Sequence, residues 1–218
     1  RQILPNSSVF MLLLKIGQAV RSLLPKEIRG LIPSKSRNAG IWPPARHKRK
    51  MLVLDGCVQP SIAPNINTAT ARILDKIGIS LIKAEKENCC GAISYHLNAQ
   101  QEGLDYMRRN IDAWWPYCDN NVARGVEAIV MTASGCGVTV KEYGNYLIND
   151  PIYSEKAARI SELTKDISEI LEDEAEQLIT LLSNMESCTK RSKLAFHSPC
   201  TLQHGLQING VVENILTT

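Results

Sequence analysis

Seven cysteines are the residues of this 218-residue chain whose type and spacing point most clearly to chemistry. Two of them are adjacent and followed by glycine, in Cys89-Cys90-Gly91, and another lies within Ser134-Gly135-Cys136-Gly137. Neighbouring cysteines rarely bridge each other and the total is odd, so the disulfide framework of a secreted protein is not expected. Thiols outside disulfides serve as metal ligands, as reactive groups or as small buried side chains.

The elements that position these cysteines are predicted from the spacing of the apolar residues. From residue 50 onward, short apolar runs alternate with segments of helical periodicity. The expected strands are 51–55, 79–83, 127–132 and 193–197; the expected helices are 65–77, 98–115 (stopped by Pro116), about 138–147, 153–185 in two pieces divided near 164–166, and one from 202 to the end. This order indicates an α/β fold, in which helices flank a parallel β-sheet.

Five cysteines follow the ends of the expected strands. In an open parallel sheet the loops after the strands meet at one edge, where ligands bind. The sequence therefore predicts a group of thiols at that edge, with glycines that let the backbone come close to whatever the thiols hold. The predicted group is Cys57, Cys89, Cys90, Cys136 and Cys200, with Gly91, Gly135 and Gly137 as the sites of close backbone approach. Cys118 and Cys188 are predicted to be buried small side chains.

The spacing of the cysteines leaves several chemistries open. Zinc prefers four ligands, often supplied by C-x-x-C pairs, and the chain contains no such pair. Iron–sulfur clusters are bound by cysteine thiolates, which can come from separate loops. A thiol–disulfide or heterodisulfide enzyme that uses Cys89 and Cys90 is one alternative, and a structural zinc or interaction module is another.

Longer strings around the cysteines resemble the CCG cysteine-rich domain family, and within it the iron–sulfur subunit of glycolate oxidase. Related domains occur in heterodisulfide reductase and in lactate-utilisation proteins. The strings that carry the resemblance are Gly56-Cys57-Val58-Gln59-Pro60, Cys89-Cys90-Gly91-Ala92, Tyr95-His96-Leu97-Asn98-Ala99-Gln100, Asn110-Ile111-Asp112-Ala113-Trp114-Trp115-Pro116, Thr132-Ala133-Ser134-Gly135-Cys136-Gly137 and Phe196-His197-Ser198-Pro199-Cys200-Thr201-Leu202-Gln203-His204.

The resemblance implies an electron-transfer subunit of an oxidoreductase, not catalytic by itself. It implies a [4Fe-4S] cluster in this chain and FAD on partner subunits that oxidise glycolate to glyoxylate, with electrons passing toward a membrane acceptor. The implied location is cytoplasmic, with a possible peripheral contact at the inner face of the cell membrane or with a quinone. The chain would be a middle fragment, with a linker over 1–50, a first CCG domain over 51–192 and the start of a truncated second one over 193–218.

The resemblance also implies roles for individual residues. Four cysteines, Cys57, Cys89, Cys90 and Cys136, are the implied ligands of the first motif, and Cys200 opens a second motif. The heterodisulfide reductase form closes its motif with C-x-x-C, whereas this sequence has only Cys136. Three nearby histidines are candidates for a contact with the cluster or its acceptor: His96, His197 and His204. The alternatives are helix caps for His96 and His204 and a core position for His197.

The first 50 residues differ from the rest in charge. They hold 11 Lys and Arg against one acid, whereas the remainder holds 14 against 21. Apolar residues at helical spacing over 9–24 predict an amphipathic helix, followed by a basic, proline-rich linker. The segment has no nucleic-acid motif and almost no aromatic residues for base stacking, so a nucleic-acid partner is not expected. The segment could instead bind a lipid surface or an acidic partner, or it could connect two folded domains.

Overall fold

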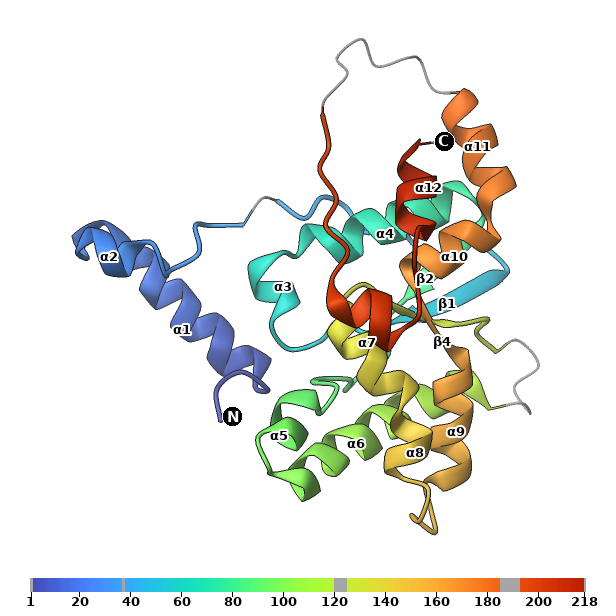
Figure 1. Ribbon diagram of the computed structural model, residues 1–218, viewed down its shortest axis with the longest axis horizontal. Helices are drawn as coiled ribbons and strands as arrows, with labels where there is room; N and C mark the ends of the chain where they lie inside the picture. Colours follow the sequence, from blue (N-terminus) through green and yellow to red (C-terminus); the bar gives the residue numbers. More distant parts are fainter. Residues whose placement is uncertain (1, 37, 120–124, 185–192, 218) are drawn as a thin grey trace.

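The computed structural model of the chain describes residues 2–36, 38–119, 125–184 and 193–217 (Figure 1). Its described part contains one four-stranded sheet in the order β2-β1-β3-β4, with every neighbouring pair parallel. The strands are β1 (Arg49–Val53), β2 (Ile79–Ile82), β3 (Ile129–Met131) and β4 (Thr164–Asp166). The predicted α/β class, a parallel sheet with flanking helices, is therefore confirmed.

Side chains alternate along each strand and so point to both faces of the sheet. Helices cover both faces, and each face therefore contributes to a separate core. Met51 and Val53 of β1 face one core, which also contains Leu74, whereas Leu52 faces the other core with Ile129. The helices that follow the strands supply the rest of both cores. The first core packs on α4 (Asn65–Lys76) and α10 (Ile167–Asp173); the second packs on α6 (Gln100–Cys118), α7 (Ser134–Lys141), α8 (Tyr143–Tyr146) and α9 (Ser154–Leu163).

The fourth strand lies where the sequence predicts only a break between two helices. β4 pairs with β3 through Ile129 and Thr164, and the side chain of Asp166 accepts a hydrogen bond from the backbone N–H of Ser168. With Glu169 reaching back to Asp166, this forms a capping box that starts α10. The prediction of a strand over 193–197 is wrong, because that segment is exposed and joins none of the strands in the described residues.

Two helix boundaries also differ from the prediction. Pro116 does not end its helix, because α6 continues to Cys118 with the proline inside it. The helix after β3 begins at Ser134, not near residue 138, so Cys136 lies in the first turn of α7 instead of in a loop. The remaining described helices are α3 (Gln59–Ile62), α5 (Ala92–His96), α11 (Ala175–Ser183) and α12 (Val211–Thr217), with the π-turn η2 (Thr201–Gly205).

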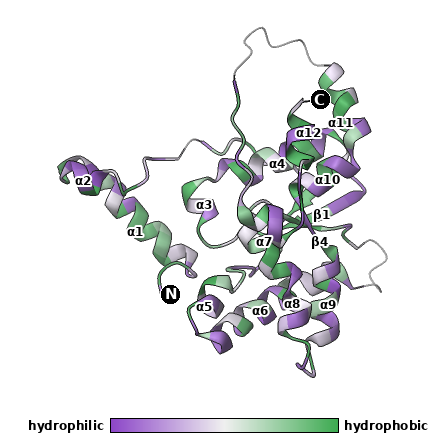
Figure 2. Ribbon diagram, viewed as in Figure 1, coloured by the Kyte–Doolittle hydropathy of each residue, from purple (hydrophilic) through white to green (hydrophobic). Residues whose placement is uncertain are grey.

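Residues 2–30 form an arm that projects from the sheet domain (Figure 1). It consists of α1 (Ser7–Val20), the turn η1 (Arg21–Leu23) and α2 (Lys26–Arg29), and α1 contacts the domain through α3. No residue of α1 is buried although the helix is strongly apolar, as Figure 2 shows. Of the helices that the structure describes, none combines the length and the hydropathy needed to cross a membrane.

The basic segment after the arm is tied to the sheet domain by specific contacts. The indole N–H of Trp42 donates to the backbone oxygen of Leu81 in β2, at 3.1 Å. Arg46 and His47 both contact the carboxylate of Asp75 on α4. Arg49 opens β1 and pairs with two acids, Glu127 and the largely buried Glu174. Arg46 and Arg49 of the basic segment are therefore paired with acids of the sheet domain.

Candidate metal centre

Four of the five predicted cysteines come together at the carboxyl ends of the strands. Cys57 follows β1, Cys89 and Cys90 follow β2, and Cys136 lies just after β3 on α7. Their thiols form a chain of hydrogen-bonding contacts, from Cys57 to Cys89, from Cys89 to Cys90 and from Cys90 to Cys136. β1 and β3 are adjacent strands at which the connections leave in opposite directions, the place where open α/β sheets bind ligands.

These contacts divide the four thiols into two kinds. Hydrogen bonds from Cys57 and Cys90 lower the pKa of Cys89 to about 3. A hydrogen bond from Cys90 likewise lowers the pKa of Cys136. Donation to these acceptors, followed by burial, raises the pKa of the Cys57 and Cys90 thiols. Cys57 and Cys90 therefore act as donors to Cys89 and Cys136, and a metal that binds cysteine binds it in the deprotonated form.

An apolar cavity of about 360 Å³ opens beside the thiols of Cys57 and Cys136. Residues after β1, on α3 and after β3 line this cavity, together with one residue of α5: Leu54, Asp55, Gly56, Cys57, Val58, Gln59, Ile62, Ala63, Ile93, Met131, Thr132, Ala133 and Cys136. Apolar side chains dominate, so bound groups would be held largely away from water. The cavity provides room beside the thiols that a multi-atom cluster requires.

The four converging side chains are of the donor type that binds iron–sulfur clusters. In the described residues no three His, Cys, Asp or Glu side chains are arranged to hold one ion. An iron–sulfur cluster presents several irons to its cysteine thiolates, so its ligands are spread over the cluster and need not meet at one point. Four thiols from the ends of three strands, beside an apolar cavity, match that requirement.

The three predicted glycines have different surroundings. Gly91 adopts φ +90°, and a Cβ there would lie 2.6 Å from the backbone oxygen of Gly103 on α6. Only glycine permits this contact, which presses the loop of the cysteine pair directly onto α6. Gly137 packs closely against Leu206 and Met131, whereas a Cβ on Gly135 would meet open space. Close approach is thus present at Gly91 and Gly137, and in both cases the group that approaches the glycine belongs to another residue of this chain.

Cys200 is exposed, unlike the other four cysteines of the predicted group. It immediately precedes η2, which packs along α7, and the Thr201 and Ser134 hydroxyls lie 2.7 Å apart. Its backbone is therefore close to the helix that carries Cys136, while its thiol faces solvent. Cys118 is buried as predicted, and burial raises its pKa to about 12; Cys188 lies outside the described residues.

All three predicted histidines are exposed. His96 ends α5 and His204 lies in η2, while His197 is in the extended segment before Cys200. The alternative of a core position for His197 is therefore wrong. None of the three histidines lies in the core, and their contacts with a cluster or an acceptor remain predictions.

Sequence reasoning missed the polar residues that hold the cysteine pair. Asn110 on α6 and Tyr143 on α8 are completely buried, and both bond to backbone atoms of Cys89 and Cys90. Glu87, just before the pair, accepts hydrogen bonds from the Asp55 backbone and the Trp114 indole; burial raises its pKa to about 7. The available signal was Asn110, a polar residue within an otherwise apolar helix face.

The matches to known proteins agree with this architecture. Residues 51–141 match the family described as "CCG: Cysteine-rich domain", and the chain therefore contains a cysteine-rich domain of this family. That span includes β1 to α7 and all four of the converging cysteines.

Several curated proteins are similar to the chain over a longer range. The glycolate oxidase iron-sulfur subunit of Escherichia coli is 47% identical over 216 residues, which is 99% of this chain and 50% of that protein. The probable glycolate oxidase iron-sulfur subunit of Bacillus subtilis is 30% identical over 57% of this chain and 26% of its own length. Lactate utilization protein A of Bacillus licheniformis is 22% identical over 72% of this chain and 58% of its own length.

The chain spans about half the length of the Escherichia coli relative. No solved structure matches it significantly.

Proposed function

We propose that this chain is part of an electron-transfer subunit of a glycolate oxidase and holds an iron–sulfur cluster. The observation that carries the proposal is the convergence of Cys57, Cys89, Cys90 and Cys136 from three strand ends beside an apolar cavity. The similarity to the Escherichia coli iron-sulfur subunit across almost the whole chain supports the same function.

A [4Fe-4S] cluster is the proposed cofactor, with those four cysteines as its ligands. Such a cluster takes up and releases one electron at a time. The chain's own contribution is to supply thiolates, to exclude water through the apolar lining around Ile93 and Met131, and to fix the ligand loops. Cys200 is proposed as the first ligand of a second site, with the exposed His96, His197 and His204 near an acceptor.

The proposed partners are FAD-containing subunits of the same oxidase. Oxidation of glycolate to glyoxylate releases two electrons and two protons, which a flavin can accept together. This chain is proposed to carry the electrons onward without itself oxidising glycolate. The proposed location is cytoplasmic, with the electrons passing to a membrane acceptor such as a quinone.

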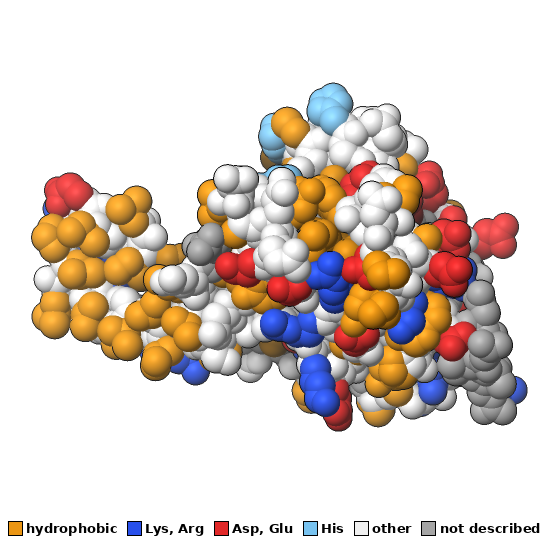
Figure 3. Space-filling model, turned by 90° about the horizontal axis from the view of Figure 1, so that it is seen from below, with side chains coloured by type: hydrophobic (Ala, Val, Ile, Leu, Met, Phe, Trp, Pro, Cys, Tyr) orange, Lys and Arg blue, Asp and Glu red, His pale blue; other side chains and the backbone are white. Residues whose placement is uncertain are grey.

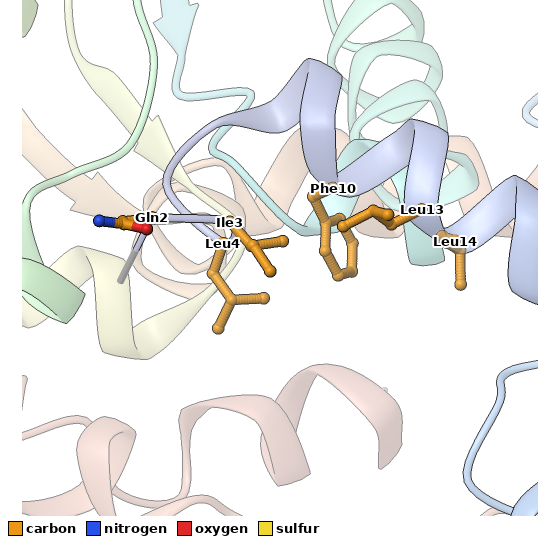
Figure 4. A pocket seen from close by; sticks show the side chains of 6 residues that line it. All are labelled: Gln2, Ile3, Leu4, Phe10, Leu13 and Leu14. Atoms are coloured by element: carbon orange, nitrogen blue, oxygen red, sulfur yellow. The ribbon is translucent and has the colours of Figure 1, made fainter.

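The projecting arm is the proposed site of peripheral contact with an anionic membrane surface. The arm is covered mainly by hydrophobic side chains (Figure 3), and Leu12 and Ile16 of α1 are 60% and 52% exposed. Gln2, Ile3, Leu4, Phe10, Leu13 and Leu14 line an open, mainly apolar hollow of about 620 Å³ on the same arm (Figure 4). The exposed Lys15, Lys26 and Lys35 supply the positive charge that favours anionic lipid headgroups.

Cosedimentation with lipid vesicles tests the membrane contact. The protein should bind vesicles rich in phosphatidylglycerol, and Leu12→Asp combined with Ile16→Asp should abolish binding, with Ile179→Asp on α11 as the control. Vesicle binding that is unchanged in the double variant would contradict the membrane contact. So would a protein that dimerises through the arm and binds no vesicles.

Analysis of the anaerobically purified protein tests the cluster. Iron, labile sulfide and zinc are measured, and the EPR spectrum is recorded after reduction with dithionite. Iron and sulfide in nearly equal amounts, with a reduced-cluster signal, are expected. Stoichiometric zinc would instead favour a structural module. A metal-free protein in which the thiols of Cys89 and Cys90 are reversibly oxidised would favour the thiol–disulfide enzyme.

A further inference from the structure

The peptide groups of the cysteine pair are held by two buried polar side chains. Asn110 and Tyr143 both have 0% exposure, although each carries groups that lose hydrogen bonds with water on burial. The Asn110 amide donates to the backbone oxygen of Cys89 at 3.0 Å, and the Tyr143 hydroxyl donates to that of Cys90 at 2.8 Å. Each carbonyl of the pair therefore has its own buried donor.

The two side chains also bond to each other. The Asn110 amide donates to the Tyr143 hydroxyl at 3.3 Å, and the Asn110 oxygen accepts from the backbone N–H of Asn88 at 2.9 Å. The Trp114 ring stacks on Tyr143, with ring centres 6.5 Å apart and planes 21° apart. The network joins α6, α8 and the cysteine loop, so the orientation of that loop depends on residues distant from it in sequence.

This network holds the carbonyl oxygens of the cysteine pair on the side of α6 and α8. The carbonyls of Cys89 and Cys90 are turned toward Asn110 and Tyr143. The N–H of Gly91, which is the other end of the Cys90 peptide group, donates instead to Cys89 Sγ at 3.5 Å; one peptide group further along, the N–H of Ala92 bonds to the Cys90 sulfur. Hydrogen bonds to the sulfur ligands are a main determinant of cluster reduction potential.

We infer that Asn110 and Tyr143 are positioning residues that set the reduction potential of the cluster by turning the carbonyls of the cysteine pair away from its sulfurs. The inference rests on the proposed cluster at the four cysteines. A reduced cluster carries one more negative charge than an oxidised one, so N–H dipoles favour reduction and carbonyl oxygens oppose it. Without the Asn110 amide and the Tyr143 hydroxyl, the carbonyl oxygens of Cys89 and Cys90 are free to turn toward the sulfur atoms.

Tyr143→Phe tests this role because it removes the hydroxyl and keeps the ring that packs on Trp114. Asn110→Ala is the second variant. The matched control is Tyr153→Phe, which removes a hydroxyl bonded to Asp112 at 2.8 Å on the exposed side of α6. The midpoint potential is measured by EPR-monitored redox titration of each anaerobically purified protein, alongside its iron and sulfide content.

We expect Tyr143→Phe to retain iron and to lower the equilibrium constant for one-electron reduction about tenfold, equivalent to a shift of about 59 mV to lower potential. Asn110→Ala should shift the potential in the same direction, and Tyr153→Phe should not shift it. Potentials equal to that of the unmodified protein in both variants would overturn the inference.

Hydrogen exchange of the metal-free protein separates this inference from the proposed function. Tyr143→Phe should accelerate exchange of the amides of residues 88–92, while those of β1 and β3 keep their rates. Unchanged exchange at 88–92 would overturn the positioning role whether or not iron binds. A protein without iron in which exchange nevertheless accelerates would overturn the proposed cluster and leave the restraint on the loop standing.

Discussion

The indole Nε1 of Trp114 donates a 2.9 Å hydrogen bond to Oε2 of Glu87, across 27 residues of sequence. The other carboxyl oxygen of Glu87 accepts from the backbone N–H of Asp55, two residues before Cys57. One half-buried carboxyl therefore joins the loop after β1 to the loop after β2, and α6 supplies the indole that it accepts from. The thiols on these two loops owe their proximity in part to this link.

Loss of the Trp114 indole N–H is expected to destabilise the fold. Trp114→Phe removes the donor to Oε2 of Glu87 and leaves a gap beside Tyr143, which together should lower the free energy of unfolding by about 1–3 kcal/mol. Urea unfolding followed by circular dichroism measures the change. Trp115→Phe is the matched control, since Trp115 is only half-buried in the same helix and should cost less. Equal losses in both variants would contradict this view of the link.

Replacement of the converging cysteines should remove iron selectively. Cys57→Ser, Cys89→Ser, Cys90→Ser and Cys136→Ser are each expected to lose most of the iron, because each removes one thiolate from a four-thiolate site. Cys118→Ala is the control, because Cys118 is also buried but lies at the far end of α6 and contacts no thiol of the group. Iron and sulfide analysis after anaerobic purification measures the outcome. Full iron content in all four serine variants would exclude the assigned ligand set.

Gly91 and Gly135 are expected to respond oppositely to alanine. A Cβ at position 91 would meet the Gly103 oxygen at 2.6 Å with φ at +90°, so Gly91→Ala should displace the cysteine pair and lower both stability and iron content. Gly135→Ala introduces a Cβ into open space within α7, where alanine is favoured over glycine by about 0.5–1 kcal/mol. Thermal unfolding and iron analysis of both variants measure the contrast. A stable Gly91→Ala protein with normal iron would refute the close-contact argument.

The Asp75 carboxyl should link stability to pH. Arg46, with a further contribution from His47, holds the pKa of Asp75 below its usual value. A carboxyl with a lowered pKa in the folded state stabilises the protein at pH values above its unfolded pKa, about 3.9, and loses that contribution as pH falls further. Asp75→Asn should therefore be less stable than the unmodified protein from pH 5 to 7, and the difference should shrink below about pH 4.

Urea unfolding at a series of pH values measures this dependence. Arg46→Gln serves as the companion variant, because it removes the main cause of the lowered pKa and keeps the carboxyl. A stability difference for Asp75→Asn that persists unchanged at pH 3 would show that the ion pair is not its source.

The cysteine group was predictable because it depends on a general property of parallel sheets. Apolar runs located β1, β2 and β3 to within about two residues, and the carboxyl ends of parallel strands always share one edge. Cys57, Cys89, Cys90 and Cys136 could thus be grouped without knowledge of any contact. The failure at 193–197 has the complementary cause: its apolar pattern suits a strand, but a strand exists only where another strand offers hydrogen bonds.

The alternation of helices and strands, the parallel sheet and the strand ends that carry the thiols could be predicted from the residues alone, because periodicity and turn residues act locally. Only the tertiary structure decided that Thr164–Asp166 completes the sheet, that Cys200 faces solvent, and that Asn110 and Tyr143 orient the cysteine pair. Asn110 and Tyr143 lie 33 residues apart and meet only when α6 and α8 pack on the same face. Such pairings depend on how whole elements pack, which no local pattern of residue types encodes.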